Sequence, residues 1–520
     1  MSTQSEEYEL DTVTFPRKEK RGIILGLDPA PLIAVSIDIV LILLISIVVP
    51  FPFGILLALC LIPVGAFLGW ARYKGKHLFE WMGIGKRHLQ RKLSGQNTYA
   101  AAGPDEDANA ERRALEKARK EDERAEKEAL EWEEEVPAKT PPPVHMRLPG
   151  AANELKAYRT VNGDGLVHDP MHHRVVITAR LKSHNFTLQD DTDQAEILDR
   201  WANVQDVIGA HRVVEHIVPT DVTTVATGQQ MQQFYEDAAR RGNAGAKLNP
   251  VAHEGYMDLL SQNVMTHHPQ YLTFALRIPE MRDEIKSNGG GMAGLLRTTD
   301  YHMGTLEADL YSNGYEIDHW VGVDERLELL HEAFSPEAIG LLEGVSGRGG
   351  PRGAKRFWDH LRVDNVWHRA FVIEEWPLKP VRPGFMEKLV LDLEFRHSVS
   401  LLHKRGNDES ALRKINNEIK DADNAENMAR RMGRRVSREQ EREREDLESR
   451  EDQMVGGASE TAFRGFVTIT ADSKDQLEQY TRDLRSAAAR ASLRIEPAYG
   501  QQFEAFLAGA CLLGLGADKR

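Results

Sequence analysis

Two long apolar runs lie close together near the N-terminus of this 520-residue chain. They cover residues 32–49 and 55–70, and a turn rich in Pro and Phe separates them. Each run approaches the length that a helix needs to cross the hydrocarbon core of a bilayer. Basic residues flank the pair on both sides and are absent from the turn, which by the positive-inside rule places both ends in the cytoplasm. The pattern predicts a two-pass protein of the bacterial cell membrane, with a transmembrane hairpin over residues 31–70 after a cytoplasmic tail over residues 1–30.

Asp38 lies inside the first apolar run. An acidic residue within a membrane span is a candidate for ion or proton transfer. The structural alternative is that Asp38, about two turns from the N-terminal basic residues, reaches the interface or pairs with a neighbouring subunit. A cleaved signal peptide is disfavoured, because the second apolar run follows the first at once.

Residues 71–147 have the pattern of a linker. The segment after the second run is amphipathic and basic, which is typical of a helix that lies on the inner leaflet. Its apolar residues are Phe79, Trp81, Met82 and Ile84. Residues 103–135 are dense in Ala, Glu, Lys and Arg, which predicts a solvated single helix or a coiled-coil stalk. The single helix is favoured because its apolar positions sustain no heptad, and a run of prolines ends it.

Beyond residue 148, strand-like and helical patterns follow one another. The predicted strands cover residues 175–181, 213–219, 271–278, 366–376, 398–404 and 463–471. The predicted helices cover residues 193–208, 231–240, 253–267, 292–313, 324–332, 385–392, 474–491 and 499–512. We predict an α+β fold, with one subdomain over residues 148–281 and a second over residues 282–520. The order of elements is that of ferredoxin-like α/β sandwiches.

A helical excursion over residues 410–451 interrupts the second subdomain. It mixes charges of both signs with few apolar residues, so we expect it to bury little surface and to project from the body. It is either a solvated arm or a contact arm for a neighbouring subunit. Candidate residues for contact with an acidic surface or nucleic acid are Arg430, Arg431, Arg434, Arg435 and Arg438.

Composition narrows the possible partners. The net charge of −14 argues against broad binding to phosphate backbones, so any contact with DNA is expected to be indirect. The two cysteines, Cys60 and Cys511, are far apart in the sequence, which excludes a disulfide framework or a multi-cysteine zinc site. We expect no metal and no cofactor.

The sequence contains no recognisable catalytic motif. No Gly-Lys pair satisfies the P-loop pattern, and no His-Glu pair is followed by the second His of a zinc peptidase. Gly289, Gly291 and Gly294 satisfy G-x-G-x-x-G, but the strand predicted to end at Ile278 lies too far upstream for a dinucleotide site. The Gly-rich stretch 347–353 is either an anion nest or a flexible loop. These absences favour a structural or interaction role over catalysis.

Several stretches resemble components of conjugative type IV secretion machines. The N-terminal layout ending in ARYKGKHLFEWMGIGKRH resembles PrgI-family two-span membrane proteins. From about residue 148 onward, five segments resemble the N-terminal, non-ATPase domain of TraC-type secretion ATPases: GDGLVHDPMHHRVVITARL, AHEGYMDLLSQ, the strand YLTFALRI, WHRAFVIEEWPLKPVRPGFMEKLV and the closing AFRGFVTITADSKDQLEQYTRDLRSAAARASLRIEPAYGQQFEAFLAGACLLG. In that family this domain builds the oligomer and docks on other subunits, while a separate P-loop domain hydrolyses ATP.

The resemblance implies a non-catalytic scaffold or anchor subunit at the inner membrane, which docks a separate P-loop ATPase. Its expected partners are the membrane, that ATPase, other secretion subunits and further copies of itself. The alternative is a membrane subunit of another export system, such as type VII secretion. An enzyme with an unrecognised site is the third hypothesis.

Overall fold

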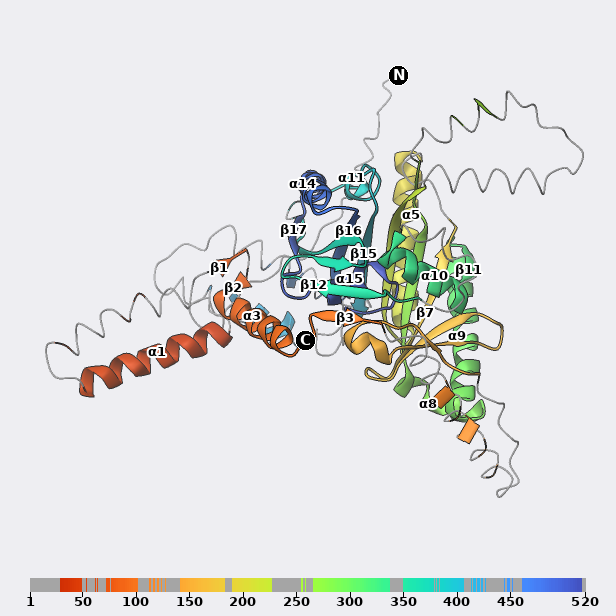
Figure 1. The fold of residues 1–520 in the computed structure, drawn as a ribbon, viewed down its shortest axis with the longest axis horizontal. Coiled ribbons are helices and arrows are strands. Elements are labelled where there is room, and N and C mark those ends of the chain that lie inside the picture. Colours follow the sequence, from red (N-terminus) through yellow and green to blue (C-terminus); the bar gives the residue numbers. More distant parts are fainter. Residues whose placement is uncertain are drawn as a thin grey trace, which may run out of the picture. The chain divides into compact units, whose positions relative to one another are not determined.

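The computed structural model describes residues 29–48, 72–74, 76–101, 141–182, 189–226, 265–336, 349–377, 384–405 and 461–516, with shorter pieces between them (Figure 1). The chain forms two compact units. Unit 1 comprises Met1–Ala100, Arg352–Glu394 and Val467–Phe506. Unit 2 comprises Ala101–Pro351, Phe395–Phe466 and Leu507–Arg520. Each unit is therefore assembled from segments that are distant in sequence.

Unit 2 is built on an antiparallel sheet with the strand order β15-β8-β10-β7-β6-β5-β4. The strands are β4 (Val144–His145), β5 (Lys156–Arg159), β6 (Gly165–Asp169), β7 (Arg174–Leu181), β8 (Val214–Ala226), β10 (Gln270–Arg277) and β15 (His397–Arg405). Two further strands, β9 (Met265–His267) and β11 (Ile317–Trp320), pair with β8 and β7. Only a few residues separate β5 from β6 and β6 from β7, so this part of the chain forms a meander.

One face of the unit 2 sheet carries the hydrophobic core. Residues that alternate along β7 and β10 point into it, as the period of a strand requires. These include Val175, Ile177, Leu272, Phe274 and Leu276. Two helices, α5 (Asp191–Ala210) and α9 (Gly291–Ser312), supply the facing side chains and contact each other (Figure 1). Shorter helices complete the unit: η1 (Gly150–Glu154), η3 (Ile278–Met281), α8 (Arg282–Ser287) and α10 (Val323–Phe334).

Unit 1 has its own antiparallel arrangement. Its strands are β3 (Thr98–Ala100), β12 (Gly353–Arg356), β13 (Leu361–Val363), β14 (Val366–Glu375) and β17 (Arg494–Pro497), and β16 (Thr461–Ala471) follows β14 in the strand order. A small hairpin, β1 (Arg72–Tyr73) with β2 (Lys76–His77), precedes α3 (Leu78–Leu93). The other helices are α11 (Glu387–Val390), α14 (Lys474–Arg490) and α15 (Gln502–Ala510), and α11 lies beside α14 (Figure 1).

A buried glutamine completes the hydrogen bonding of β14. The backbone N–H of Ala370 donates to Gln502 Oε1 at 2.9 Å, and Gln502 Nε2 donates to the Ala370 carbonyl at 3.0 Å. The neighbouring pair along the ladder is Phe371 with Pro497, and proline has no N–H to donate. The Ala498 N–H, just after β17, also donates to the Ala370 carbonyl at 2.9 Å, so Gln502 adds a second donor there and supplies the acceptor for the Ala370 N–H.

The first apolar run forms α1 (Pro29–Val48), and the second lies almost entirely outside the described residues. Within the described part of the chain, no helix has both the length and the apolar character that crossing a bilayer requires. The predicted hairpin over residues 31–70, and the two-pass location in the cell membrane that it implied, are therefore wrong. The helix over the first run ends at Val48, and among the described residues no second apolar helix follows it to complete a hairpin.

The predicted ferredoxin-like sandwich is also wrong, because the strands of unit 2 pair along the path β15-β8-β10-β7-β6-β5-β4, which is longer than the four-stranded sheet of a ferredoxin-like unit. The types of many single elements were nonetheless predicted, including β7, α5, β10, α9, α10, β14, β15, β16 and α14. The short strands β4, β5, β6, β12 and β13 were missed because two to five residues are too few to show a period. The predicted helix 253–267 ends in strand β9, and the predicted helix 231–240 lies outside the described residues.

Two glycines of α9 allow a matched test of its packing on α8. A Cβ atom on Gly294 would lie 2.3 Å from the carbonyl oxygen of Ile285, whereas one on Gly304 would meet nothing within 4 Å. We expect Gly294→Ala to destabilise unit 2 by about 1–3 kcal/mol, because backbone must move. Gly304→Ala should stabilise it by up to about 1 kcal/mol through helix propensity. Urea unfolding midpoints of both variants check this, and equal shifts in the same direction would contradict it.

Candidate functional site

The residues singled out by sequence do not form the site. Asp38 lies half-buried on α1, and Arg430, Arg431, Arg434 and Arg435 lie outside the described residues. Their proposed contacts therefore stay predictions.

The described pieces of the excursion over residues 410–451 bury more than its composition predicts. Ile415 and Leu447 are each 2% exposed. The guanidinium of Arg444 donates to Glu448 at 2.9 Å and to Glu426 at 3.3 Å, and the second of these pairs joins residues 18 positions apart.

The G-x-G-x-x-G stretch is not a dinucleotide site. Both η3 and α8 stand between the end of β10 and the start of α9, so the strand-turn-helix that would hold a pyrophosphate is absent from this part of the structure. Gly294 instead permits the close contact of α9 with Ile285. Of the Gly-rich stretch 347–353, only residues 349–353 are described, and Gly353 begins β12.

A polar site with many hydrogen bonds surrounds residues 509–516, here called the C-terminal segment. Four of its carbonyl groups accept hydrogen bonds from side chains of β15, α10, β8 and β16. The pairs are Ser398 Oγ to Gly509 O (2.8 Å), Ser400 Oγ to Gly509 O (2.9 Å), Arg326 Nη1 to Leu512 O (2.9 Å), His216 Nε2 to Gly514 O (2.8 Å) and Arg464 Nη1 to Gly516 O (3.1 Å). We call this set of contacts the clasp.

The backbone of the C-terminal segment is shaped to present these carbonyls. Leu512 has φ of 54° and Gly514 has φ of 58°, both in the left-handed region. A Cβ on Gly514 would also lie 3.1 Å from Val176 Cγ1. Leu513 is 1% exposed, so the segment is buried as well as bonded. A left-handed leucine costs free energy that only firm surroundings offset.

Arg326 is the most unusual member of the clasp. It lies in the first turn of α10 and is 1% exposed. Burial lowers the pKa of its guanidinium to about 10, so the group is still charged at neutral pH. Its Nε and Nη2 atoms have no hydrogen-bond partner among the described residues. A buried, partly paired cation is costly, so the surrounding contacts of unit 2 must offset the cost of burying Arg326.

His216 binds the segment as a neutral ring. It is 2% exposed, and its Nε2 must donate because the Gly514 carbonyl can only accept. Burial, together with the charge of Arg174, lowers the pKa of the imidazole to about 4. The tautomer with the proton on Nε2 is therefore the one that the clasp requires at neutral pH.

An ionic cluster borders His216 at one end of the sheet. Arg174 Nε donates to Asp169 Oδ2 at 3.0 Å, and the Arg174 guanidinium lies 3.7 Å from Glu215 Oε2. Lys404 Nζ donates to Glu215 Oε1 at 2.9 Å, and His172 Nδ1 lies 2.7 Å from Asp169 Oδ2. Charged side chains thereby join β6, β7, β8 and β15.

The environment of Glu215 keeps this cluster ionised. Burial alone would raise the pKa of its carboxyl, but the Lys404 hydrogen bond and nearby positive charges bring it below its ordinary value. Glu215 therefore stays negative at neutral pH and offsets the charges of Arg174 and Lys404.

The arrangement holds the C-terminal segment in place through hydrogen bonds to its carbonyls. Among the described residues, no group of three or more His, Cys, Asp or Glu side chains is placed to hold a metal ion. Burial raises the pKa of the Cys511 thiol far above its ordinary value, which leaves it unreactive. The described polar groups of this site thus serve to fix the C-terminal segment on unit 2.

Sequence reasoning missed Arg174, His216 and Arg326. The available signal was a charged or ionisable residue within an apolar run, as in HHRVVITARL and VEHIV. Such residues are buried only when paired, so each predicts an unseen partner. Arg174 is paired with the carboxylates of Asp169 and Glu215. Arg326 and His216 instead bind backbone carbonyls 186 and 298 residues away, and the identity of such a partner is not encoded locally.

Comparison with known proteins adds no family. No protein-family model matches the chain, and a search of curated proteins finds no match. The observations that bear on function are therefore the clasp and the resemblance of the sequence segments.

Proposed function

We propose that this chain is a non-catalytic scaffold subunit of a conjugative type IV secretion machine that docks a separate P-loop ATPase. The observation that carries the proposal is the clasp. Side chains from four elements hold one buried segment by its carbonyls, and an ionic cluster ties four strands beside it. Such a site produces a rigid body, which is what a docking subunit needs.

Two of the segments that resemble the TraC-type docking domain contribute residues to this rigid body. GDGLVHDPMHHRVVITARL contains β6, β7 and the Asp169–Arg174 pair, and AFRGFVTITADSKDQLEQY contains most of β16 with Arg464. The resemblance therefore supports a docking role through residues with an identifiable structural task. In this proposal the chain acts as a homo-oligomer, and its contact with DNA is indirect.

The experiment is capture of the tagged full-length chain from its host cells after mild crosslinking, with identification of the co-purifying proteins. A separate P-loop ATPase of the secretion type is the expected partner. The purified chain itself should hydrolyse ATP no faster than buffer. Turnover that persists through purification to homogeneity would overturn the proposal, as would capture of type VII components in place of the ATPase.

A matched pair of serine variants tests whether the clasp matters for docking. Ser398→Ala with Ser400→Ala removes both serine donors to Gly509, and Ser312→Ala removes a serine that, in the described part of the chain, donates to Ala308 within α9. We expect the double variant to capture several-fold less ATPase and the α9 variant to capture a normal amount. Thermal melting must first show that both variants are folded. Equal capture of ATPase by both variants would mean that the clasp does not contribute to docking.

A further inference from the structure

Four aromatic rings from separate segments of unit 1 form a cluster: Tyr73, Trp81, Trp358 and Tyr499. Their centroids lie 5.8 Å apart for Tyr73 and Trp81, 5.3 Å for Trp81 and Tyr499, 6.1 Å for Trp81 and Trp358, and 6.2 Å for Trp358 and Tyr499. These spacings fall in the range of favourable aromatic contacts. We call this set the aromatic cluster.

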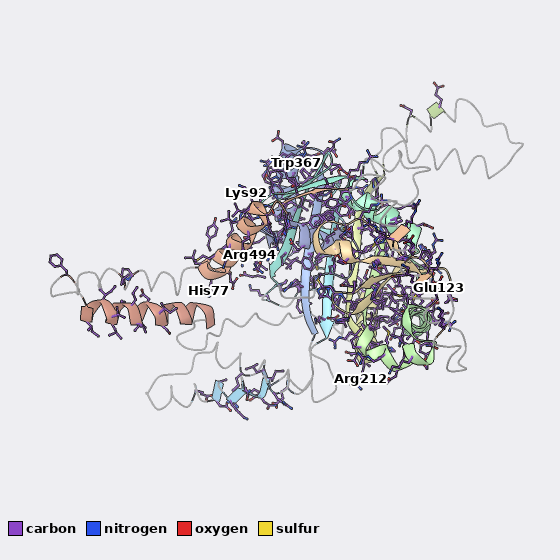
Figure 2. All side chains as sticks on the ribbon, turned by 60° about the horizontal axis from the view of Figure 1, so that its bottom comes forward. His77, Lys92, Glu123, Arg212, Trp367 and Arg494 are labelled. Atoms are coloured by element: carbon purple, nitrogen blue, oxygen red, sulfur yellow. The ribbon has the colours of Figure 1, made fainter. Side chains whose placement is uncertain are left out.

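The cluster is built into the unit by α3, whose two ends are marked by His77 and Lys92 (Figure 2). Trp81 Nε1 donates to the Tyr73 carbonyl at 2.9 Å. Ile84 is buried, and a Cβ on Gly500 would lie 2.9 Å from both Ile84 and Trp358. Trp81 and Ile84, which the sequence assigned to a membrane-facing surface, therefore face the protein.

The cluster already holds a cation. The Lys74 ammonium lies 4.3 Å from the centroid of the Tyr499 ring and 5.7 Å from that of Tyr73, and it donates a hydrogen bond to the Tyr499 hydroxyl. Burial works against its charge, but the Tyr499 hydrogen bond and the nearby Glu496 carboxylate raise its pKa. The rings and Glu496 thus form an environment that favours an ammonium group.

Two features indicate that Lys74 is more than a surface residue resting on a ring. Lys74 has φ of 49°, a left-handed conformation that is uncommon for lysine and that the β1–β2 turn imposes. Tyr73 is 62% exposed, so one wall of the cluster is open to solvent. A cation from outside can therefore reach the rings if the Lys74 side chain swings away while the hairpin, which carries Tyr73, stays in place.

We infer that the aromatic cluster is a binding site for a lysine or arginine side chain of a partner protein, and that Lys74 is the internal occupant which this side chain displaces. The attraction of a cation to aromatic faces supplies the affinity, and Glu496 supplies the countercharge. The inference does not depend on the partner being an ATPase, so it stands apart from the proposed function.

The test uses the full-length chain and a fluorescein-labelled hexalysine peptide, with binding measured by fluorescence anisotropy at fixed salt. Lys74→Ala should bind the peptide about 3- to 10-fold more tightly than the unmodified chain, because the internal competitor is gone. Lys92→Ala removes the same charge from an exposed position on α3 and controls for general electrostatics. It should change the affinity less than 2-fold, as expected for a screened surface charge.

A second variant separates the rings from the lysine. Lys74→Ala combined with Tyr499→Leu should return the affinity to that of the unmodified chain, since it removes the ring nearest the cation. Melting temperatures of all variants establish that they are folded. An equal gain in Lys74→Ala and Lys92→Ala, or a gain that survives loss of Tyr499, would overturn the inference.

Discussion

Acidification from pH 7 to pH 4 is expected to remove about 3 kcal/mol from the stability of unit 2 through His216 alone. The pKa of this buried ring is lowered from 6.5 to about 4 in the folded protein. Between these values the unfolded chain binds a proton that the folded chain does not, so stability falls as the pH falls. The contribution is fully present above pH 6.5 and is lost by about pH 4.

The groups near His216 act on its pKa in both directions, and their net effect lowers it. Burial is the largest cause of the lowered pKa, and Arg174 on β7 adds to it. The Gly514 carbonyl and Glu215 act in the opposite sense. Protonation at Nδ1 would also place a second positive charge beside the Arg174 guanidinium. His403 on β15, whose pKa burial lowers to about 4, adds a loss of the same sign.

Urea unfolding at pH 7, 5.5 and 4.5 measures this loss, and His216→Gln is the informative variant. An amide can still donate to Gly514 but cannot titrate, so the unfolding free energy of this variant should vary less with pH and keep only the contributions of the other titrating groups, among them His403 and His168. His319→Gln is the control: Glu325 and Asp318 raise the pKa of that ring, and it is 41% exposed. If His216→Gln keeps the full pH dependence, the neutral-ring account of the clasp is wrong.

The elements that the sequence predicted well are those in which one physical pattern dominates. The apolar run in β7 and the amphipathic period of α14, which begins after the capping Ser473, both agree with the structure within a residue or two. The membrane hairpin failed for a related reason. The prediction of a hairpin over residues 31–70 rested on apolar composition alone, and composition contains no information about long-range contacts.

The candidate site was not predictable, because its contacts join residues far apart in the chain. Arg326 reaches Leu512 across 186 positions, and His216 reaches Gly514 across 298. A sequence pattern reports the local period of a helix or strand, whereas these bonds depend on which strands become neighbours. The sequence does indicate that such partners exist, because an arginine such as Arg174 at the start of an apolar strand requires a buried partner.

Loss of Arg369 is expected to destabilise unit 1 by about 3 kcal/mol. This side chain is 3% exposed and donates to two carboxylates, a hydroxyl and a carbonyl. The bonds are Nη2 to Glu478 Oε1 (2.7 Å), Nη1 to Glu478 Oε2 (3.1 Å), Nη2 to Asp359 Oδ2 (3.0 Å), Nη1 to Thr481 Oγ1 (2.8 Å) and Nε to Asp359 O (3.1 Å). Breaking a buried pair costs about 3–5 kcal/mol, and the partial exposure of both acids favours the lower value.

Urea unfolding of three variants tests this expectation in steps. They are Arg369→Ala, Arg369→Lys and the control Arg362→Ala. Lysine keeps the charge but cannot form the two-pronged bond to Glu478, so it should recover only part of the loss. Arg362 is exposed on β13 beside Trp367, and its removal should cost less than about 1 kcal/mol.

Titration of Glu478 gives a readout that a cavity alone would not change. The Arg369 hydrogen bond is the largest cause of the lowered pKa of this carboxyl. In Arg369→Ala the pKa, followed by NMR, should therefore rise toward its ordinary value, while in Arg362→Ala it should stay low. A destabilised Arg369→Ala variant with an unchanged Glu478 pKa would mean that packing, and not the bidentate ion pair, is what Arg369 contributes to unit 1.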